Sequence, residues 1–186
     1  MRIIGGNFKG KKISLPNDKK TRPLKDIVKE SIFNLIEHSN MIKVNITNSV
    51  VLDLFSGSGS FGLECLSRNA KKVFFFENYP AAIEVLNKNV KSLKNIDNYR
   101  IFENDCFDYF KTIKNFDYNC DIIFIDPPYK ETKVNEIIEN ILIKKILNKN
   151  GIIIIHRHKN ETEELTKKIN IFESRTYGIS KIFFGN

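Results

Sequence analysis

The sequence has few of the residues that cross-link small secreted proteins or bind metal ions. Its 186 residues include three cysteines, and no two of these have the Cys-x-x-Cys spacing of zinc and redox sites. An odd number of isolated cysteines argues against a disulfide framework and fits free thiols in a reducing cytoplasm. His156 and His158 form a candidate metal pair, but no thiolate pair stands near them in the sequence. We therefore predict no metal site.

Long apolar runs, internal repeats and linkers are absent as well. No stretch reaches the about 18 consecutive apolar residues that a membrane-spanning helix requires. Gly5, Gly6 and lysines interrupt the first apolar stretch, so we expect no signal peptide. The chain is long enough for an autonomous hydrophobic core. These features favour one domain over residues 1–186, in a cytoplasmic protein that acts as a monomer and has no membrane partner.

Positive charge is concentrated at the amino terminus. The net charge is +8, and residues 1–30 contain nine Lys and Arg against three Asp and Glu, a net of +6. The other 156 residues carry 21 basic and 19 acidic side chains. A cationic arm on a nearly neutral body indicates a polyanionic partner such as RNA, although solvated surface charge is the alternative. The candidate RNA-binding residues are Arg2, Lys9, Lys11, Lys12 and Arg22.

The most informative stretch is Val50 to Gly62, which reads V-V-L-D-L-F-S-G-S-G-S-F-G. Its apolar, largely β-branched start predicts a strand buried on both faces of a parallel sheet. Asp53 stands near the carboxyl end of that strand, and three glycines follow. Glycines at a strand-to-helix turn allow a ligand to approach the backbone, so this turn is the predicted binding site.

Gly57, Gly59 and Gly62 have the G-x-G-x-x-G spacing of dinucleotide-binding turns, and Glu77 follows about 20 residues later. A carboxylate at Asp53 would face the pyrophosphate of a dinucleotide, which is electrostatically unfavourable. The same carboxylate suits a ligand with an ammonium or sulfonium charge. S-adenosylmethionine carries both charges, has a ribose for Glu77 and has no phosphate. We therefore predict S-adenosylmethionine, and not NAD, as the cofactor.

Strand and helix patterns alternate along the chain and predict a Rossmann-like α/β fold. We expect a mostly parallel seven-stranded sheet with helices on both faces and an antiparallel edge hairpin around Gly178. The strands are predicted at residues 50–54, 72–76, 99–102, 121–125, 151–155, 172–177 and 181–184. The helices are predicted at residues 23–38, after Phe61, at 80–93, after Asp105, at 133–147 and at 162–169. Residues 1–22 form a basic β-hairpin arm with its turn at Gly5-Gly6-Asn7, and residues 23–186 form the catalytic core.

Four of the predicted strands end near an acidic residue, at Asp53, Glu77, Asp105 and Asp126. The carboxyl ends of parallel strands meet at one edge of a sheet, where ligands bind. A single acid at a strand end is a common surface feature, but four in this order suit a nucleoside ligand. Glu77 can accept from both ribose hydroxyls, and Asp105 from the amino group of adenine. The predicted cofactor-binding residues are Asp53, Phe55, Gly57, Gly59, Glu77, Asp105 and Cys106.

The most specific motif is Asp126-Pro127-Pro128-Tyr129, which follows the buried strand I-I-F-I. The prolines fix the backbone, so the Asp126 carboxylate and the Pro127 carbonyl can act as paired acceptors. Two acceptors that hold the hydrogens of a base amino group would direct its lone pair toward an incoming methyl group. Tyr129 offers a flat face on which the base can stack, an interaction worth about 1–3 kcal/mol. A rigid turn after a strand would explain the prolines alone. The predicted catalytic residues are Asp126, Pro127 and Tyr129.

The sequences D-L-F-S-G-S-G and D-P-P-Y together resemble the class I, S-adenosylmethionine-dependent N-methyltransferases. Further motifs cover nearly the whole chain: R-I-I-G-G-x-x-x-G at 2–10, R-P at 22–23, D-x-x-x-E-x-x-F-N at 26–34, G-L-E-x-L-S-R at 62–68 and Tyr177-Gly178. This set is similar to the bacterial 16S ribosomal RNA guanine-N2 methyltransferases of the RsmD type. The resemblance implies methylation of one guanine of 16S ribosomal RNA, alone or within a partly or fully assembled small subunit.

Three positions depart from the pattern of that family. Leu24 stands where a threonine usually follows Arg-Pro, His156 where a glutamate commonly ends a strand, and Asn78 where a second acid is common. These departures concern substrate contacts and leave the glycine turn and D-P-P-Y intact.

Three other functions would explain parts of the sequence. D-P-P-Y also occurs in enzymes that methylate adenine or cytosine amino groups of DNA, but the chain has no room for a long target-recognition insertion. A nicotinamide-dependent oxidoreductase would explain the glycines and neither Asp53 nor D-P-P-Y. A non-catalytic RNA-binding module would have no use for four acids at strand ends.

Overall fold

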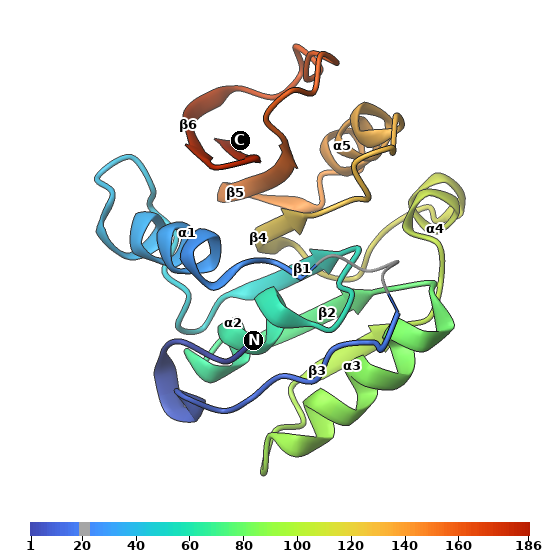
Figure 1. Cartoon of the computed structure of the whole chain (residues 1–186). Coiled ribbons are helices and arrows are strands. Elements are labelled where there is room, and N and C mark those ends of the chain that lie inside the picture. The colour runs from blue at the N-terminus through green and yellow to red at the C-terminus, as the bar shows by residue number, and fades with distance from the viewer. Residues whose placement is uncertain (19–22) are drawn as a thin grey trace.

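The strand patterns form a seven-stranded sheet in the computed structural model, which describes residues 1–18 and 23–186 (Figure 1). The strand order is β3-β2-β1-β4-β5-β7-β6. The first five strands in this order are parallel, and β7 runs antiparallel to both β5 and β6. The strands are β1 (Val50–Leu54), β2 (Lys72–Phe76), β3 (Tyr99–Phe102), β4 (Cys120–Ile125), β5 (Leu147–His158), β6 (Ile171–Tyr177) and β7 (Ser180–Gly185). The predicted fold class is therefore confirmed, including the antiparallel edge hairpin.

Helices cover both faces of the sheet. The helices are α1 (Asp26–His38), α2 (Ser60–Ser67), α3 (Pro80–Ser92), α4 (Cys106–Thr112) and α5 (Val134–Ile143). Buried residues of α1, α2 and α3 pack in one core cluster, and those of α4 and α5 pack in another. Among the described residues, no helix is both long and apolar enough to cross a membrane.

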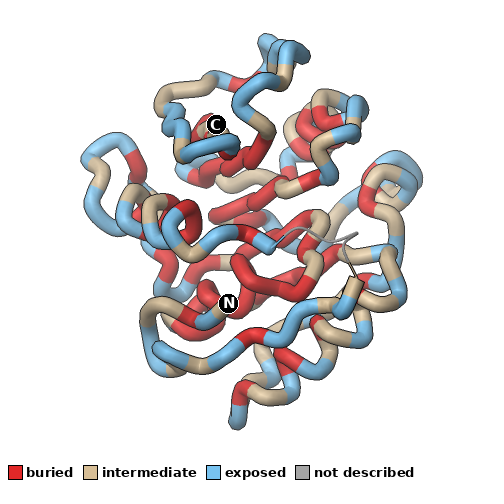
Figure 2. The backbone as a smooth tube through the Cα atoms, viewed as in Figure 1, coloured by how far each residue is buried: buried red, intermediate tan, exposed pale blue. Residues whose placement is uncertain are grey.

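The central strands are buried on both faces, as their apolar sequences predict (Figure 2). Along β4, Ile122 and Phe124 face the cluster with α1–α3, whereas Ile123 and Ile125 face the cluster with α4 and α5. Side chains of a strand alternate between its faces, so a continuous apolar run supplies both cores at once. The same arrangement fixes the carboxyl ends of β1, β2 and β4 at one edge of the sheet.

The amino-terminal arm folds back on itself but is not a regular hairpin. Its strand pairing is limited to one isolated antiparallel bridge between Arg2 and Lys12, and its tip is a 3₁₀ turn, Gly6–Phe8. The backbone N–H groups of Ile4 and Gly5 donate to the Glu64 carboxylate of α2 and not to an opposite strand. Two backbone hydrogen bonds flank the bridge, from the Ile3 N–H to the Lys11 carbonyl at 2.9 Å and from the Ile13 N–H to the Met1 carbonyl at 3.0 Å. The predicted pairing is therefore present but short, and contacts with α2 add to it.

The predicted helix at residues 162–169 is wrong, because this segment has no helical structure. The Thr166 N–H donates to the side chain of Asn135 on α5, 2.7 Å away, and the Glu164 carbonyl accepts from the same side chain at 2.9 Å. Side-chain partners thus satisfy backbone groups that a helix would pair internally.

Several other boundaries differ from the predicted ones, and the longest extension is that of β5, which spans Leu147–His158 and not 151–155. The first helix begins at Asp26 and not at Pro23, because Pro23 and Leu24 line a cavity instead. Helix α5 ends at Ile143 and not at Leu147, which already belongs to β5. Lys145 between them has a left-handed backbone (φ 55°), which a helix cannot continue through.

Candidate active site

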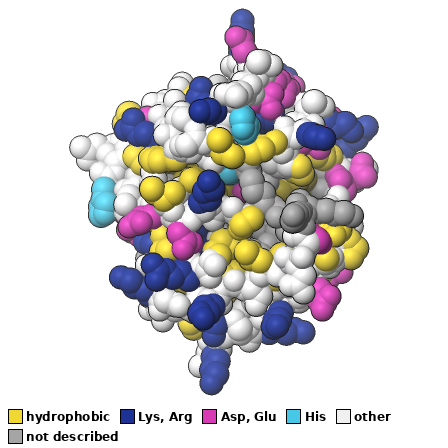
Figure 3. Space-filling view, viewed as in Figure 1, with side chains coloured by type: hydrophobic (Ala, Val, Ile, Leu, Met, Phe, Trp, Pro, Cys, Tyr) yellow, Lys and Arg dark blue, Asp and Glu magenta, His cyan; other side chains and the backbone are white. Residues whose placement is uncertain are grey.

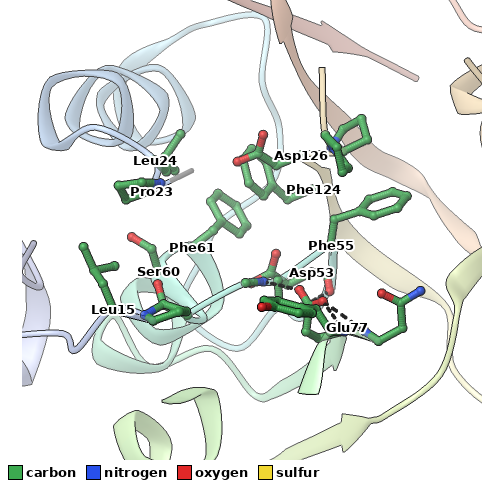
Figure 4. Close-up of a pocket in the computed structure, with 18 of the residues that line it drawn as sticks. Leu15, Pro23, Leu24, Asp53, Phe55, Ser60, Phe61, Glu77, Phe124 and Asp126 are labelled. Carbon is green, nitrogen blue, oxygen red and sulfur yellow. Dashed lines mark hydrogen bonds between the residues drawn. The ribbon is translucent and has the colours of Figure 1, made fainter. Parts of the chain in front are cut away.

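A cavity of about 440 Å³ opens at the carboxyl-terminal edge of β1, β2 and β4. Leu15, Pro23 and Leu24 lie on one side of it and Phe55 on the other, with Glu77 and Asp126 at separate strand ends (Figure 4). Of the predicted catalytic and cofactor-binding residues, those that line the cavity are Asp53, Phe55, Gly57, Glu77, Asp126, Pro127 and Tyr129. Gly59, Asp105 and Cys106 do not belong to its lining.

Gly57 and Gly59 of the glycine turn have different structural roles. Gly57 and Gly59 both have left-handed backbones, with φ of 54° and 83°. A Cβ at Gly57 would meet no described atom within 4 Å, so this residue leaves open space where it lines the cavity. A Cβ at Gly59 would stand 2.4 Å from Leu86 Cδ1 of α3. Gly57 therefore keeps the cavity open, whereas Gly59 allows close packing of α2 against α3.

Asp53 is a carboxyl group buried at the base of this turn, with 1% of its surface exposed. Its Oδ2 accepts from the N–H of Gly62 at 2.9 Å. Burial raises the pKa of the Asp53 carboxyl well above its usual range, and the negative charges of Asp126 and Glu77 add to that effect. A cationic ligand in the cavity would counter these effects and favour the ionised carboxylate.

Glu77 ends β2 and supports the glycine turn directly. Its Oε2 accepts from the Gly57 N–H at 2.7 Å, and its Oε1 accepts from the N–H groups of Asn78 and Tyr79. These bonds fix the carboxylate beside the turn. Each carboxylate oxygen has two lone pairs, so both of those on Oε1 are used and one on Oε2 remains for a ligand.

Asp105 and Cys106 lie one strand further along, at the start of α4. Asp105 caps this helix by accepting from the N–H groups of Phe107 and Asp108, and it also accepts from the Asn78 side chain at 2.9 Å. Cys106 is buried, and burial raises the pKa of its thiol. Asp105 is thus linked to the cavity through Asn78, which lines it.

The D-P-P-Y segment forms the wall opposite the glycine turn. Oδ1 of Asp126 lies 2.8 Å from Nδ1 of His156, a buried residue of β5. The Tyr129 ring meets the His158 ring edge-on, with centroids 4.8 Å apart. The sequence analysis considered the two histidines as a metal pair and His156 as a departure from the family pattern, but neither as a contact of the D-P-P-Y segment. The contacts link residues about 30 positions apart in the chain, and only their shared place at adjacent strand ends could have suggested them.

The basic residues of the arm are spread over one side of the molecule. Arg2, Lys9 and Lys12 are exposed, whereas the Lys11 ammonium donates to the Ser92 carbonyl at the end of α3. Arg22 lies outside the described residues. Lys and Arg side chains gather on the lower part of the face in Figure 3, over the arm and α3.

The tip of the arm lies away from the cavity. The Phe8 N–H donates to Ser67 at the end of α2, whereas Ser60 at the start of that helix lines the cavity. Further along the arm, Leu15 and Pro16 reach the cavity themselves. The arm therefore runs from the far end of α2 to the site.

The whole chain, residues 1–186, matches the family described as "Conserved hypothetical protein 95". It is 36% identical over 173 residues to the "Ribosomal RNA small subunit methyltransferase D" of Buchnera aphidicola, covering 93% of this chain and 86% of that protein. It is 31% identical over 180 residues to the protein of the same name from Haemophilus influenzae, covering 96% and 90%.

Among solved structures, "Putative methyltransferase yhhF from Escherichia coli" superposes with a TM-score of 0.83. It is 26% identical to this chain, and the match covers 100% of this chain and 96% of that one. The family match and this superposition cover the whole chain, the arm and the sheet alike. The chain therefore belongs to the family of the ribosomal RNA small subunit methyltransferase D proteins.

Proposed function

We propose that this protein transfers a methyl group from S-adenosylmethionine to the N2 amino group of a guanine in 16S ribosomal RNA. The observation that carries this proposal is that the glycine turn and D-P-P-Y line one cavity, with Gly57, Asp53 and Asp126 around the same space. Direct transfer needs two reactants held next to each other in a fixed orientation. The names of the relatives support small-subunit ribosomal RNA as the substrate class.

The residues around the turn fit S-adenosylmethionine. Gly57 leaves space on the cavity side, and the buried Asp53 favours a cationic group. Oε2 of Glu77 offers its remaining lone pair to a ribose hydroxyl, and Phe55 offers an apolar surface. The bound cofactor supplies a methyl group that is already activated on a sulfonium.

D-P-P-Y would hold the guanine. The Asp126 carboxylate and the Pro127 carbonyl accept hydrogen bonds from the N2 amino group, and Tyr129 stacks on the base. Holding both hydrogens directs the nitrogen lone pair, which is otherwise delocalised into the ring, toward the methyl group. Positioning and electrostatics supply most of the acceleration, and no covalent intermediate with the protein is required.

The position of the site constrains the RNA. Tyr129 is half-buried at the cavity wall, so the target guanine must leave its stack to reach it. A loop or an unpaired base is therefore the expected substrate. The exposed lysines of the arm would contact phosphates and position the RNA without reading its sequence. The protein would act in the cytoplasm as a monomer.

Mass spectrometry of nucleosides tests the proposal. Small-subunit ribosomal RNA from cells that lack the protein is incubated with the purified protein and labelled S-adenosylmethionine, then digested. The expected product is N2-methylguanosine at one position, absent from RNA incubated without protein. Label in an adenine or cytosine derivative would overturn the guanine assignment, and no label in any nucleoside would overturn the proposed activity.

A further inference from the structure

His156 and Asp126 stand side by side at the ends of neighbouring parallel strands. The register pairs Ile125 of β4 with Ile155 of β5, so the next residue of each strand end comes into contact. Nδ1 of His156 and Oδ1 of Asp126 are 2.8 Å apart. The His156 side chain is 2% exposed and that of Asp126 is 13% exposed, so this bond forms largely away from water.

The chemistry of the two groups sets the direction of the bond. An ionised carboxylate can only accept, so the proton between them belongs to Nδ1 of His156, which donates. One lone pair of Oδ1 is thereby occupied by a donor from the protein.

The donor is held rigidly. The backbone of His156 is paired with Ile182 of β7, and the residue before it, Ile155, is paired with Ile125 of β4. The ring also packs edge-on against the ring of Tyr129, with centroids 6.2 Å apart. His156 therefore contacts two of the three predicted catalytic residues, and a central strand fixes its position.

We propose that His156 is a positioning residue that sets the orientation of the Asp126 carboxylate toward the amino group of the substrate base. This inference rests on the proposed role of Asp126 in methyl transfer. A fixed N–H donor on Oδ1 restricts rotation of the Asp126 carboxylate about its side-chain bonds before the substrate arrives. Preorganisation of this kind lowers the barrier of the chemical step and leaves cofactor binding unchanged.

Two variants of nearly equal shape isolate the hydrogen bond. The amide N–H of His156→Asn can replace the Nδ1–H donor, whereas His156→Leu has no donor. We expect His156→Leu to lower kcat at least about tenfold, with the Kd of S-adenosylmethionine unchanged within about twofold. His156→Asn should recover most of the lost activity. His156→Met is a second donor-free variant if His156→Leu does not fold.

Two controls accompany these variants: Ile154→Ala, at a buried residue of the same strand, and the double variant of Asp126→Ala with His156→Leu. Ile154→Ala opens a cavity on the same face of β5 without touching Asp126, and it should lower stability while kcat stays near the wild-type value. In the Asp126→Ala background, His156→Leu should cost no further activity, because the group that it positions is gone. Additive losses, or equal activities of the Asn and Leu variants, would overturn the inference.

The Asp126→Ala variant also separates the two proposals. Full activity in this variant would remove the proposed role of Asp126 and the positioning role with it. An inactive Asp126→Ala variant together with a fully active His156→Leu variant would overturn only the role of His156.

Discussion

Lys29 of α1 and Glu64 of α2 form an ion pair with both side chains fully buried, with 3.7 Å between Nζ and Oε2. The Lys29 ammonium also donates to the Arg2 carbonyl at 2.6 Å, and the Glu64 carboxylate accepts from the N–H groups of Ile4 and Gly5. The pair therefore connects two helices to the amino-terminal arm. Desolvation by burial lowers the pKa of Lys29, whereas the charges of Glu64 and Asp26 act in the opposite direction.

We expect Glu64→Gln to be strongly destabilising. It leaves the buried Lys29 ammonium without its buried partner, and such a loss typically costs about 3–5 kcal/mol. Urea denaturation would measure the change in the free energy of unfolding. Glu37→Gln is the matched control, because Glu37 forms an exposed ion pair with Arg68 that should contribute under about 1 kcal/mol. Similar losses of unfolding free energy in Glu64→Gln and Glu37→Gln would show that burial of the Lys29–Glu64 pair does not matter for stability.

Asp53→Asn should make the protein more stable near neutral pH while it loses the cofactor. The pKa of Asp53 is raised in the folded protein, so the folded state binds this proton more tightly than the unfolded chain. The resulting stability is complete below the ordinary pKa of 3.8 and is lost as pH rises through the raised value. Asparagine avoids that loss and still accepts from Gly62. A gain of about 1 kcal/mol or more is expected, since one pKa unit corresponds to about 1.4 kcal/mol.

Thermal unfolding across a pH series, with and without S-adenosylmethionine, would check both the gain in stability and the loss of cofactor binding. The advantage of Asp53→Asn should shrink as pH falls toward 3.8, and only the wild type should be stabilised by the cofactor. Asp117→Asn, at an exposed aspartate, should change neither the stability of the protein nor its stabilisation by the cofactor. Stabilisation of the Asp53→Asn variant by the cofactor would contradict the role of Asp53 in binding.

Gly57→Val should abolish cofactor binding and cost the fold little more than backbone strain. The new side chain would occupy the open space at the cavity, and its left-handed backbone would cost about 1–2 kcal/mol. Gly178→Val is the matched control, because Gly178 also has a left-handed backbone (φ 59°) and an added Cβ there would meet no described atom within 4 Å. Gly178 lies at the turn between β6 and β7. Calorimetry should find an affinity for S-adenosylmethionine that is at least about tenfold weaker in Gly57→Val and unchanged in Gly178→Val. Equal affinities would place the cofactor elsewhere.

The elements that the sequence predicted well are those with one dominant local signal. Apolar runs such as the one at 122–125 admit few structures other than a buried strand, and their order implies a parallel sheet. The acids that end these strands follow directly, which is why Asp53, Glu77 and Asp126 were located at the cavity. The family resemblance is confirmed by relatives that are similar over most of the chain.

Other features depend on contacts between distant residues and have no local signal. Asp105 at a strand end is equally the capping residue of the helix that follows, and the structure shows the capping bonds. Lys29 occurs in an ordinary amphipathic helix, and nothing in its neighbours indicates that it is fully buried against Glu64. The segment at 162–169 looked helical by its apolar spacing, but the Asn135 side chain on α5 bonds its backbone instead.

The exposed lysines of the amino-terminal arm are expected to bind RNA phosphates. Lys9 and Lys12 are exposed, whereas Lys11 is bound to the Ser92 carbonyl, so the first two are the lysines available for phosphates. We expect Lys9→Ala with Lys12→Ala to weaken RNA binding and to flatten its salt dependence. Each lost phosphate contact should lower the slope of log K against log salt by about 0.7–0.9. Titration of a 16S ribosomal RNA fragment at several salt concentrations measures this slope.

The control variant replaces Lys71 and Lys149 with Ala. Both are exposed, Lys71 just before β2 and Lys149 near the start of β5, and so lie toward the sheet edge opposite the cavity. It removes the same charge as the arm variant, so an effect of net charge alone would appear equally in both. A smaller slope in the arm variant only, with unchanged affinity for S-adenosylmethionine, is the expected result, because the two arm lysines lie outside the cavity lining. Identical slopes for the wild type and the arm variant would mean that RNA binds elsewhere on the protein.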